Sequence, residues 1–480
     1  MSQPNEKLLL ARRRRGWSQD RAAAEIGVER KTYIRWERGV NAPQPGTLDM
    51  ACQAFGLSAV ELGFLEAESD LESNGKGLSP ALHQQRSGHI NLDASILLGL
   101  KVVQLMGVVN QRAGRVLQCR EIQALVDREL KVLDESIPSG GQEEYKISRR
   151  QALITIAALP TTLLLWRPGE VVAGPDPVEF LPQCAASITA CWHLLKGDGL
   201  GAVEHILPKF VPALTDLALH TSLYQQEAGY LGAQANILQA ILAMHQLNVV
   251  GRERYCQAAI KCGRASGDSR LTAAAFMYLG YTYSFCYRPQ KPEQAIRAFQ
   301  EGLKVLGEEE SLIRSDIAMG LAEAYAQCRN EQQALHYMTI AQDAFPIYPE
   351  NDPSYVYAEC GLNTLYQWEG KMYLELAGAY EGRGYQQSAW DAVARSAGTQ
   401  SVSERSTNET IIYQADAARL IGDLRVYTGF LRDGAQMALT LGSQKRYAEA
   451  YEAYQRTPEK WRTEPQIKLL EKDVFRQVPV

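Results

Sequence analysis

The sequence lacks the cysteine, histidine and glycine patterns that mark several classes of protein. Its nine cysteines are an odd number, with no C-x-x-C pair and no Cys/His cluster at zinc spacing, which argues against a disulfide framework or a structural zinc site. The seven histidines are scattered, and the motifs H-E-x-x-H and G-x-S-x-G and a glycine-rich nucleotide loop are missing. We therefore expect reduced, mostly buried thiols in a cytoplasmic protein that is not an enzyme and holds no metal or cofactor.

The sequence also has few features of a secreted or membrane-spanning protein. The N-terminal "MSQPNEKLLLARRRRGWSQ" places a short apolar segment before its arginines, which is not the order of a secretory signal. An apolar segment at 151–166 has sixteen residues, short of the roughly 20 that span a bilayer, and Pro160 interrupts it. We expect no membrane partner for this chain.

Ser-Arg-Arg at 148–150, just ahead of that segment, resembles the start of the twin-arginine export motif S-R-R-x-F-L-K. Ala152 and Ile154 depart from its Phe and Lys, and almost 150 residues precede the motif. We expect a buried helix and extended turn here, with a membrane-surface contact and export as alternatives. The two arginines would then lie in solvent, and residues 152–165 would pack under the first helical hairpins.

Length, composition and charge favour a folded protein of several parts. A chain of 480 residues is long enough for about two to four domains, and 46% hydrophobic with 22% charged residues is near the globular average. Residues 1–65 carry ten Lys and Arg against seven Asp and Glu, so only this end suits a polyanion. Helical patterns dominate, which predicts an all-α fold in three parts: residues 1–66, 67–179 and 180–480.

Residues 5–66 predict five short helices. Gly27 supplies a tight turn between the second and the third, where a positive φ costs glycine little. Two helices joined in this way form a helix-turn-helix, whose second member is sized for the DNA major groove. This member carries four polar side chains near its exposed start: Arg30, Lys31, Thr32 and Arg35.

This stretch resembles the Cro/C1-type (Xre) helix-turn-helix family over most of residues 6–65. The signature residues occur in family order without a gap: Arg12, Gly16, Ser18, Gln19, Ala23, Gly27, Val28, Trp36, Glu37, Gly39 and Pro43. The resemblance implies that Gln19 contacts phosphate and braces the recognition helix. It also implies that Arg12 and Glu37 occupy positions that pair inside the domain.

The same resemblance implies contacts with double-stranded DNA. The residues it assigns are Gln19, Arg30, Lys31, Thr32, Arg35, Arg38 and Asn41. Arg30 and Lys31, with Arg35 one turn on, would face base edges, where an arginine fork can bond guanine O6 and N7. Arg38 and Asn41 would lie near backbone phosphates. One recognition helix covers only a half-site, so a homodimer is expected.

Residues 67–179 are predicted to be a linker and helical connector. The segment 66–91 is polar, charged and glycine-containing, which is typical of a linker. Its "NGKGLS" lacks the first glycine of a phosphate-binding loop and the hydroxyl directly after the lysine, which argues against an ATP-driven regulator. Residues 92–135 predict one or two helices that join the modules.

Beyond about residue 180 the chain repeats a helical-hairpin pattern. The clearest unit is "MGLAEAYAQCRNEQQALHYMTIAQDAF", and related units occupy 276–306 and 373–398, with a weaker one at 228–266. Residues 444–455 are interpreted as the second helix of a last unit. The units resemble tetratricopeptide repeats, although the intervals between equivalent alanines, 39 and 55 residues, are not a uniform length. A tetratricopeptide-like (TPR-like) α-solenoid is expected.

A stack of helical hairpins has a concave face formed by the first helix of each pair, and such faces usually bind peptides or protein segments. Carrying the family's inward positions over to this sequence gives Met277, Tyr281, Asp316, Met319, Glu323, Gln327 and Lys371. Ordinary helix surface or packing between repeats stays open for each of them. The prediction therefore concerns the groove more than any one residue.

These features together predict a cytoplasmic, sequence-specific transcriptional regulator. Its head, the helix-turn-helix domain of residues 1–66, would read DNA. The repeats would bind a peptide or protein signal and pair two heads. The arrangement resembles the peptide-responsive regulators of Gram-positive bacteria. Two alternatives stay open: a repeat scaffold whose head only localises it or contacts protein, and repeats that dimerise without a ligand.

Overall fold

The structure is a computed structural model, and its second half is described almost continuously. The described residues are 119–135, 142–161 and 175–475 except Glu310, and, in the first 64, residues 5, 7–8, 11–12, 15, 17, 19–28, 30–37, 43, 45–55, 62 and 64. The predicted linker and the helical pattern that follows it up to residue 118 lie outside these ranges. The chain forms two compact units, Met1–Gln84 and Gln85–Val480.

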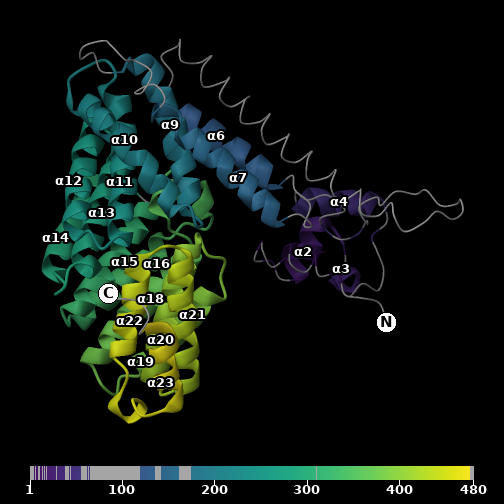
Figure 1. The fold of residues 1–480 in the computed structure, drawn as a ribbon. Helices are drawn as coiled ribbons and strands as arrows, with labels where there is room; N and C mark the ends of the chain where they lie inside the picture. Colours follow the sequence, from purple (N-terminus) through teal and green to yellow (C-terminus); the bar gives the residue numbers. More distant parts are fainter. Residues whose placement is uncertain are drawn as a thin grey trace, which may run out of the picture. The chain divides into compact units, whose positions relative to one another are not determined.

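The first unit contains the predicted helix-turn-helix. Its helices with described bounds are α2 (Gln19–Ile26), α3 (Arg30–Glu37) and α4 (Pro45–Phe55) (Figure 1). Gly27 turns the chain between α2 and α3 with a φ of +79°, a left-handed conformation that glycine adopts without a Cβ clash. A small apolar core joins the segments: Leu8, Ala11, Ala22, Ala23, Ile26, Tyr33, Trp36, Ala51, Phe55 and Leu62. Most of the predicted fifth helix lies outside the described residues.

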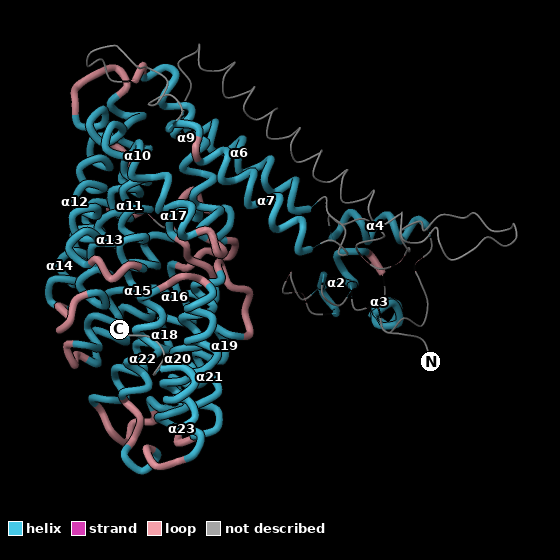
Figure 2. Tube along the Cα trace, in the orientation of Figure 1, coloured by secondary structure: helices cyan, strands magenta, loops and turns pink. Residues whose placement is uncertain are grey.

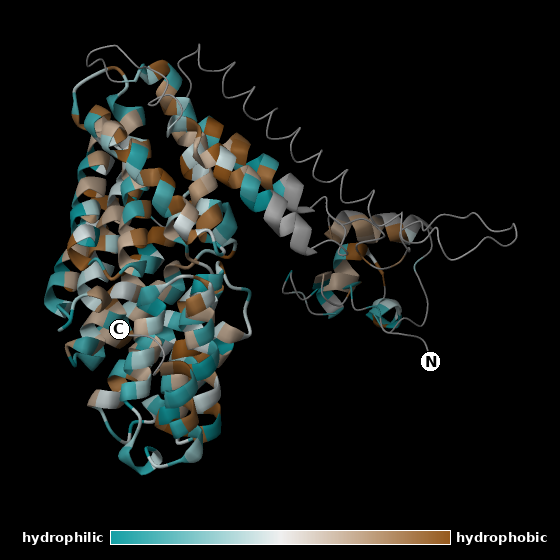
Figure 3. Ribbon diagram, viewed as in Figure 1, coloured by the Kyte–Doolittle hydropathy of each residue, from teal (hydrophilic) through white to brown (hydrophobic). Residues whose placement is uncertain are grey.

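The second unit begins with α6 (Cys119–Glu135) and α7 (Gln142–Ala157), which both pack against α9 (Pro177–Leu195). The Asp176 carboxylate caps α9 by accepting a hydrogen bond from the Val178 amide, and Pro177 stands at the first helical position. The hydropathy colouring shows mostly hydrophobic residues on α9, and most of its side chains are buried (Figure 3). The predicted connector helices are thus part of the same core as the repeats.

The end of α7 accounts for the twin-arginine-like segment. Ala152, Leu153 and Ile156 are buried in the common core, so the predicted packing of this run is confirmed as far as residue 161. Residues 162–166 lie outside the described ranges. Arg150 is exposed and pairs with Asp198 at 3.0 Å, as expected for a solvent-facing cation. Arg149 is half-buried, so the expectation of a fully solvated pair is wrong for this residue.

The helices that follow α10 (Leu200–Leu219) are joined by short turns into hairpins (Figure 2). The hairpins are α11 (Gln225–His245) with α12 (Val249–Ser266), α13 (Ser269–Tyr281) with α14 (Pro292–Leu306), α15 (Leu312–Gln327) with α16 (Glu331–Ala344), α18 (Leu362–Ala379) with α19 (Tyr385–Ala397), and α20 (Glu404–Ile421) with α21 (Leu424–Thr440). The described part of the chain contains no strand, so the fold is all-α, as predicted.

Shorter elements complete the array. The π-helix η2 (Thr282–Cys286) extends α13, while η3 (Pro349–Asn351) and α17 (Tyr355–Ala358) connect α16 to α18. The C-terminal elements are α22 (Gln444–Gln455), η4 (Glu459–Trp461), α23 (Pro465–Leu470) and η5 (Glu471–Phe475). Among the described helices, none is both long and apolar enough to cross a membrane.

Small residues allow the hairpins to pack closely, as the sequence predicts. Phe299 on α14 lies between Gly280 on α13 and Gly320 on α15. A Cβ atom added at Gly280 would lie 2.4 Å from Phe299 Cε1, and one added at Gly320 would lie 2.5 Å from Cζ. Both distances are shorter than carbon atoms tolerate, so glycine is required at both positions.

The predicted units at 276–306 and 373–398 coincide with hairpins, and so does the clearest unit at 319–345. The α20–α21 hairpin has no counterpart in the prediction. The interpretation of 444–455 as a second helix is wrong, because α22 contacts α20 and α11, which are both first helices of their pairs. α22 therefore belongs to the inner row.

The inner row closes on itself. α11, α13, α15, α18, α20 and α22 each contact the next, and α22 also contacts α11. His245 Nδ1, just before the α11–α12 turn, lies 2.6 Å from Ser443 Oγ. Lys445 Nζ of α22 donates a hydrogen bond to the Phe285 carbonyl of η2 at 2.7 Å. The array therefore encloses an interior lined by its first helices.

Candidate functional site

The exposed surface of α3 is cationic. Arg30, Lys31 and Arg35 are exposed, and Thr32 beside them is half-buried. Tyr33 and Trp36 on the opposite surface are buried in the core of the unit. Lys31 and Arg35 are four residues apart and so lie on one side of the helix. The structure thus brings these four predicted DNA-binding residues together. Arg38 and Asn41 lie outside the described residues.

Glu37 fixes the end of α3 to the rest of the domain. Its Oε1 accepts a hydrogen bond from Arg12 Nε at 2.6 Å, and its Oε2 accepts one from Gln19 Nε2 at 2.7 Å. Arg12 Nη1 also donates to the Trp17 carbonyl at 2.9 Å. The predicted pairing of Arg12 with Glu37 is confirmed. Gln19, at the start of α2, joins the two helices of the motif through the same carboxylate.

This network is largely removed from solvent. The side chains of Arg12 and Glu37 are 13% and 6% exposed, and the hydrogen bond from Arg12 to Glu37 raises the pKa of the Arg12 guanidinium. Tyr33, in the same core, has a raised pKa because burial disfavours the phenolate. The orientation of α3 is therefore set by a charged network inside the domain.

Arg15 has a structural role. Its Nη2 donates a hydrogen bond to the Phe55 carbonyl at the end of α4 at 2.5 Å, and its guanidinium carbon lies 5.1 Å from the Trp17 ring centroid. This arginine ties α4 to the start of the domain. Its charge still adds to the positive surface, because the residue is exposed.

Residues 8–62 match the family model described as Helix-turn-helix. This match covers α2, the Gly27 turn, α3 and α4, so the class of the first unit is a DNA-binding helix-turn-helix domain. The match supports a DNA-binding regulator and leaves the helical array unassigned. A comparison with curated proteins finds no match for this chain.

Two cavities among the described residues of the array share the side chain of Phe285. One has a volume of about 110 Å³ and is lined by α11, α12, α13, α15, α18, α20 and α22. The other has a volume of about 340 Å³ and lies among α18, α20 and α22. Both linings are rich in charged side chains. Charged side chains thus line a partly enclosed space inside the array.

The predicted groove residues fall into three groups: those that line a cavity, those that lie beside Lys371, and those buried in the hydrophobic core. Tyr281 and Asp316 line the smaller cavity, and Lys371 lines the larger one. Glu323 and Gln327 lie beside Lys371 and bond to it or to each other. Met277 and Met319 have no exposed surface and pack in the hydrophobic core, so the structure does not place these two in a groove. These two side chains pack between helices instead, because thioether side chains fill irregular spaces in a core.

Asp316 and Tyr281 form a buried acid–phenol contact. The Tyr281 hydroxyl donates a hydrogen bond to the Asp316 carboxylate, and the Tyr281 ring stacks on Trp368 with centroids 4.8 Å apart. Burial raises the pKa of Asp316 to about 7, while the hydrogen bond from Tyr281 opposes this rise. This carboxyl group therefore titrates near neutral pH inside the cavity.

Lys371 is held by aromatic rings and a carboxylate. Its Nζ lies 4.5 Å from the Phe285 ring centroid and 4.7 Å from that of Trp368. The same atom lies 3.1 Å from Glu323 Oε1. Burial raises the pKa of Glu323, and Lys371 opposes this rise. The pair closes off one side of the interior with buried charge.

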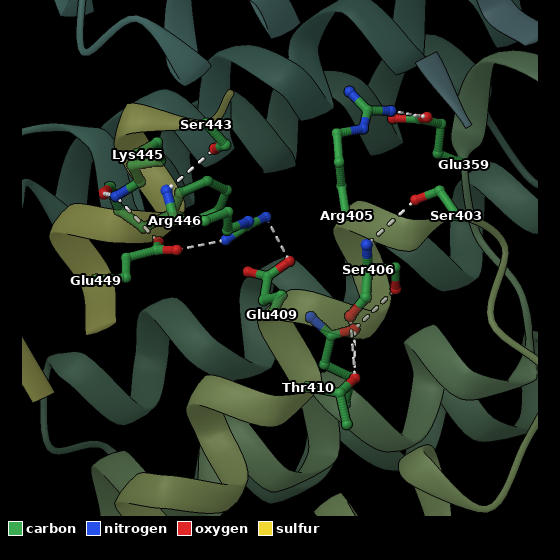
Figure 4. Close-up of polar contacts among 12 residues, drawn as sticks. Glu359, Ser403, Arg405, Ser406, Glu409, Thr410, Ser443, Lys445, Arg446 and Glu449 are labelled. Carbon is green, nitrogen blue, oxygen red and sulfur yellow. Dashed lines mark hydrogen bonds and ion pairs between the residues drawn. The ribbon is translucent and has the colours of Figure 1, made fainter. Parts of the chain in front are cut away.

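Three arginines of the smaller cavity were not found from the sequence: Arg252, Arg405 and Arg446. Arg446 lies between Glu409 and Glu449, with a 2.6 Å contact to each carboxylate (Figure 4). Glu409 is 37 residues away along the chain, so no local spacing links it to Arg446. The only signal in the sequence was an arginine at a helix position that faces inward. Without the fold, such an arginine cannot be told from an arginine on the surface.

Neither a disulfide nor a metal site is found among the described residues. None of the nine cysteines forms a disulfide, and six are buried, as predicted: Cys119, Cys184, Cys191, Cys256, Cys262 and Cys360. Burial raises the pKa of Cys256 to about 11 and that of Cys191 to about 12, which makes these thiols poor nucleophiles at neutral pH. The described residues contain no group of three or more His, Cys, Asp and Glu side chains that could hold a metal ion.

Proposed function

We propose that this protein is a sequence-specific, DNA-binding transcription regulator, and that its TPR-like array binds a peptide or protein signal and pairs two chains. The DNA-binding part rests on one observation above the others. Arg30, Lys31 and Arg35 are exposed together on α3 of a domain that matches the helix-turn-helix family. A cytoplasmic location and the lack of a catalytic role belong to the same proposal.

The chemistry of these side chains fits DNA. Arginine presents a planar fork that bonds guanine O6 and N7 in the major groove, and lysine attracts phosphate oxygens as a point charge. The recognition helix must keep a fixed orientation to read bases, and the Arg12–Glu37–Gln19 network supplies it. Since one such helix covers a half-site, two chains are proposed to bind together.

The ligand-binding part is supported by the interior of the array. Its first helices converge on cavities of about 110 and 340 Å³, and charged groups from four of these helices, α15, α18, α20 and α22, reach them. A segment with its own charged groups could exchange partners with this network. Such a ligand would regulate DNA binding if it preferred one curvature of the array over another.

A selection from a randomised pool of double-stranded DNA tests the main proposal. The full chain should enrich one sequence with two related half-sites. Replacing Arg30, Lys31 and Arg35 together by alanine should abolish this binding at physiological salt. The matched control replaces three exposed cations of the array, Arg254, Lys261 and Arg297, and should leave enrichment intact because it removes the same charge elsewhere.

The proposal fails if no sequence is enriched, or if the α3 variant binds as well as the control. Either result favours a scaffold in which the helix-turn-helix contacts protein. Sedimentation of the chain with and without the selected DNA tests the pairing. A single chain on a two-half-site DNA would contradict dimerisation through the array.

A further inference from the structure

Arg252 of α12 is one of the most completely buried large side chains in the chain, with 1% of its surface exposed. Its Nε donates a hydrogen bond to Thr282 Oγ1 at 2.9 Å, and its Nη1 donates one to the Ala240 carbonyl at 3.3 Å. Within the described ranges the guanidinium forms no ion pair with a carboxylate, and Nη2 makes no hydrogen bond. A buried positive charge thus lacks a counter-charge.

This arrangement is unusual in energetic terms. A guanidinium does not lose its proton in proteins, so Arg252 cannot escape the cost of burial by becoming neutral. Buried charges are normally paired with an opposite charge, because unpaired burial is strongly unfavourable. The contact to the Phe285 ring, 5.9 Å from the guanidinium carbon to the centroid, offsets only part of this cost.

Arg252 lines the cavity of about 110 Å³ together with Arg405 and Arg446. Arg405 pairs with Glu359 at 2.6 Å, and Arg446 pairs with Glu409 and Glu449 (Figure 4). The Nε atoms of Arg405 and Arg446 are nevertheless buried without a hydrogen-bond partner among the described residues. The carboxylates near these arginines thus leave several of their N–H donors unused.

The remaining titratable groups of the cavity do not balance Arg252. Burial and then the charge of Arg405 lower the pKa of His245 well below its usual value, which keeps this imidazole neutral. Asp316 is the third carboxyl group of the lining. Its carboxylate accepts the Tyr281 hydrogen bond, and its pKa of about 7 leaves it partly protonated at neutral pH. Among the three arginines of the lining, Arg252 is therefore the one with no carboxylate paired to it in the described part of the chain.

We propose that this cavity binds an anionic oxygen group, a carboxylate or a phosphate, with Arg252 as its main partner. The volume of about 110 Å³ admits several water-sized groups, which suits such a head group and its first attached atoms. Arg252 would bind one oxygen through Nη2, and the positive charges of Arg405 and Arg446, which line the same cavity, would stabilise the bound anion. This inference rests on the proposed function and gives the signal a chemical class.

Thermal unfolding of the full chain tests the site. Inorganic phosphate and acetate are added separately, each against sodium chloride at the same ionic strength. A ligand that binds the folded state raises Tm progressively with its concentration. At least one of the two anions should raise Tm above the chloride control. The Arg252→Met variant should show at least a tenfold weaker dissociation constant, while Arg254→Met, an exposed arginine of the same helix, should respond like the wild type.

The chloride control separates a ligand site from a structural role. Removing an unpaired buried charge should leave Tm unchanged or higher, so Arg252→Met should be at least as stable as the wild type without added anion. A lower Tm in chloride, or an equal anion response in Arg252→Met and wild type, would overturn the proposal. If Arg252→Met does not fold, Arg252→Lys replaces it in the test. Lysine keeps the charge but not the planar guanidinium, so the anion response of Arg252→Lys should be weaker than that of the wild type.

A second arm distinguishes the sources of the anion. A pool of hexapeptides with free C-terminal carboxylates is compared with the same pool amidated. A larger Tm rise with the free carboxylates than with phosphate or acetate supports a peptide end as the bound group, and a rise with phosphate or acetate but not with the peptides supports a small anion. No rise with any of these probes overturns the proposal. None of the measurements contains DNA, so loss of DNA selection with intact anion binding would remove only the proposed regulator function.

Discussion

Lys371 Nζ lies 3.1 Å from Glu323 Oε1, and this ion pair joins α18 to α15 inside the array. The Glu323 side chain is 0% exposed and that of Lys371 is 10% exposed, so both charges are removed from water. The second carboxylate oxygen of Glu323 is buried without a hydrogen-bond partner in the described part of the chain. The carboxylate therefore depends on Lys371 more than a surface carboxylate would.

Replacing Lys371 by methionine should destabilise the array. The change keeps the length of the side chain but leaves Glu323 as a buried carboxylate without a counter-charge, which costs about 3–5 kcal/mol. Urea unfolding followed by circular dichroism measures this loss, because the array supplies most of the helix. The double variant Glu323→Gln with Lys371→Met should regain most of the stability. A single variant within about 0.5 kcal/mol of the wild type would show that the pair contributes little.

How far the sequence predicts the structure depends on the distance between partners along the chain. Gly27 and the exposed cations of α3 follow from local spacing, and the pairing of Arg12 with Glu37 follows from a family resemblance that fixes both positions. Lys371 and Glu323 were found as inward positions of their helices, but their direct contact depends on the curvature of the array. No local pattern contains that curvature.

The α20–α21 hairpin was not predicted for a related reason. The buried side of α20 carries polar residues, among them Asn408, Thr410 and Asp416, so its hydrophobic periodicity is weak. These groups find partners in other helices: Asn408 Nδ2 donates to the Gly434 carbonyl at 2.7 Å, and Asp416 pairs with Arg456. Hydrogen-bonded and ion-paired polar side chains can be buried in a stable core, but they hide the hydrophobic periodicity on which sequence interpretation depends.

Alanine at Gly280 or Gly320 should destabilise the array through Phe299. The new methyl group at either position would overlap the ring, with distances of 2.4 and 2.5 Å to its nearest atoms. Overpacking of this kind costs about 1–3 kcal/mol. The control is Gly429→Ala on α21, where a Cβ meets no atom within 4 Å. This variant should be neutral or more stable by up to about 1 kcal/mol, since alanine favours helix. Equal Tm values for Gly280→Ala and Gly429→Ala would contradict the packing.

Asp316 should make the stability of the array depend on pH. Its pKa is about 7 in the folded chain and 3.8 when unperturbed, so between pH 4 and 7 the folded state binds the extra proton. Stability conferred by that proton is present near pH 4 and is lost as the pH rises through 7, with a slope of up to about 1.4 kcal/mol per pH unit. Asp316→Asn has no such proton to lose and can still accept the Tyr281 hydrogen bond.

The free energy of unfolding of the wild type, relative to Asp316→Asn, should therefore fall as the pH rises from 4 to 7. Comparing the two chains cancels the titration of Glu375, whose pKa burial also raises to about 7. Urea unfolding at pH 4.5, 5.5, 6.5 and 7.5 measures the difference. Parallel curves for the two chains would show that Asp316 is ionised throughout this range.

Glu37→Ala should loosen the helix-turn-helix without affecting the array. The change removes the acceptor of Arg12 and Gln19 and leaves the mostly buried guanidinium of Arg12 without its counter-charge. We expect the free energy of local opening, measured by hydrogen–deuterium exchange of the amides in α2 and α3, to fall by about 3 kcal/mol.

The matched control is Glu25→Ala, which removes an exposed ion pair to Arg21 at 3.6 Å and should change the opening free energy by less than about 0.5 kcal/mol. DNA binding should weaken with Glu37→Ala alone, because the cations of α3 would lose their fixed orientation. Equal exchange in the two variants would mean that α3 is held by its apolar contacts, with Tyr33 and Trp36 sufficient to orient it.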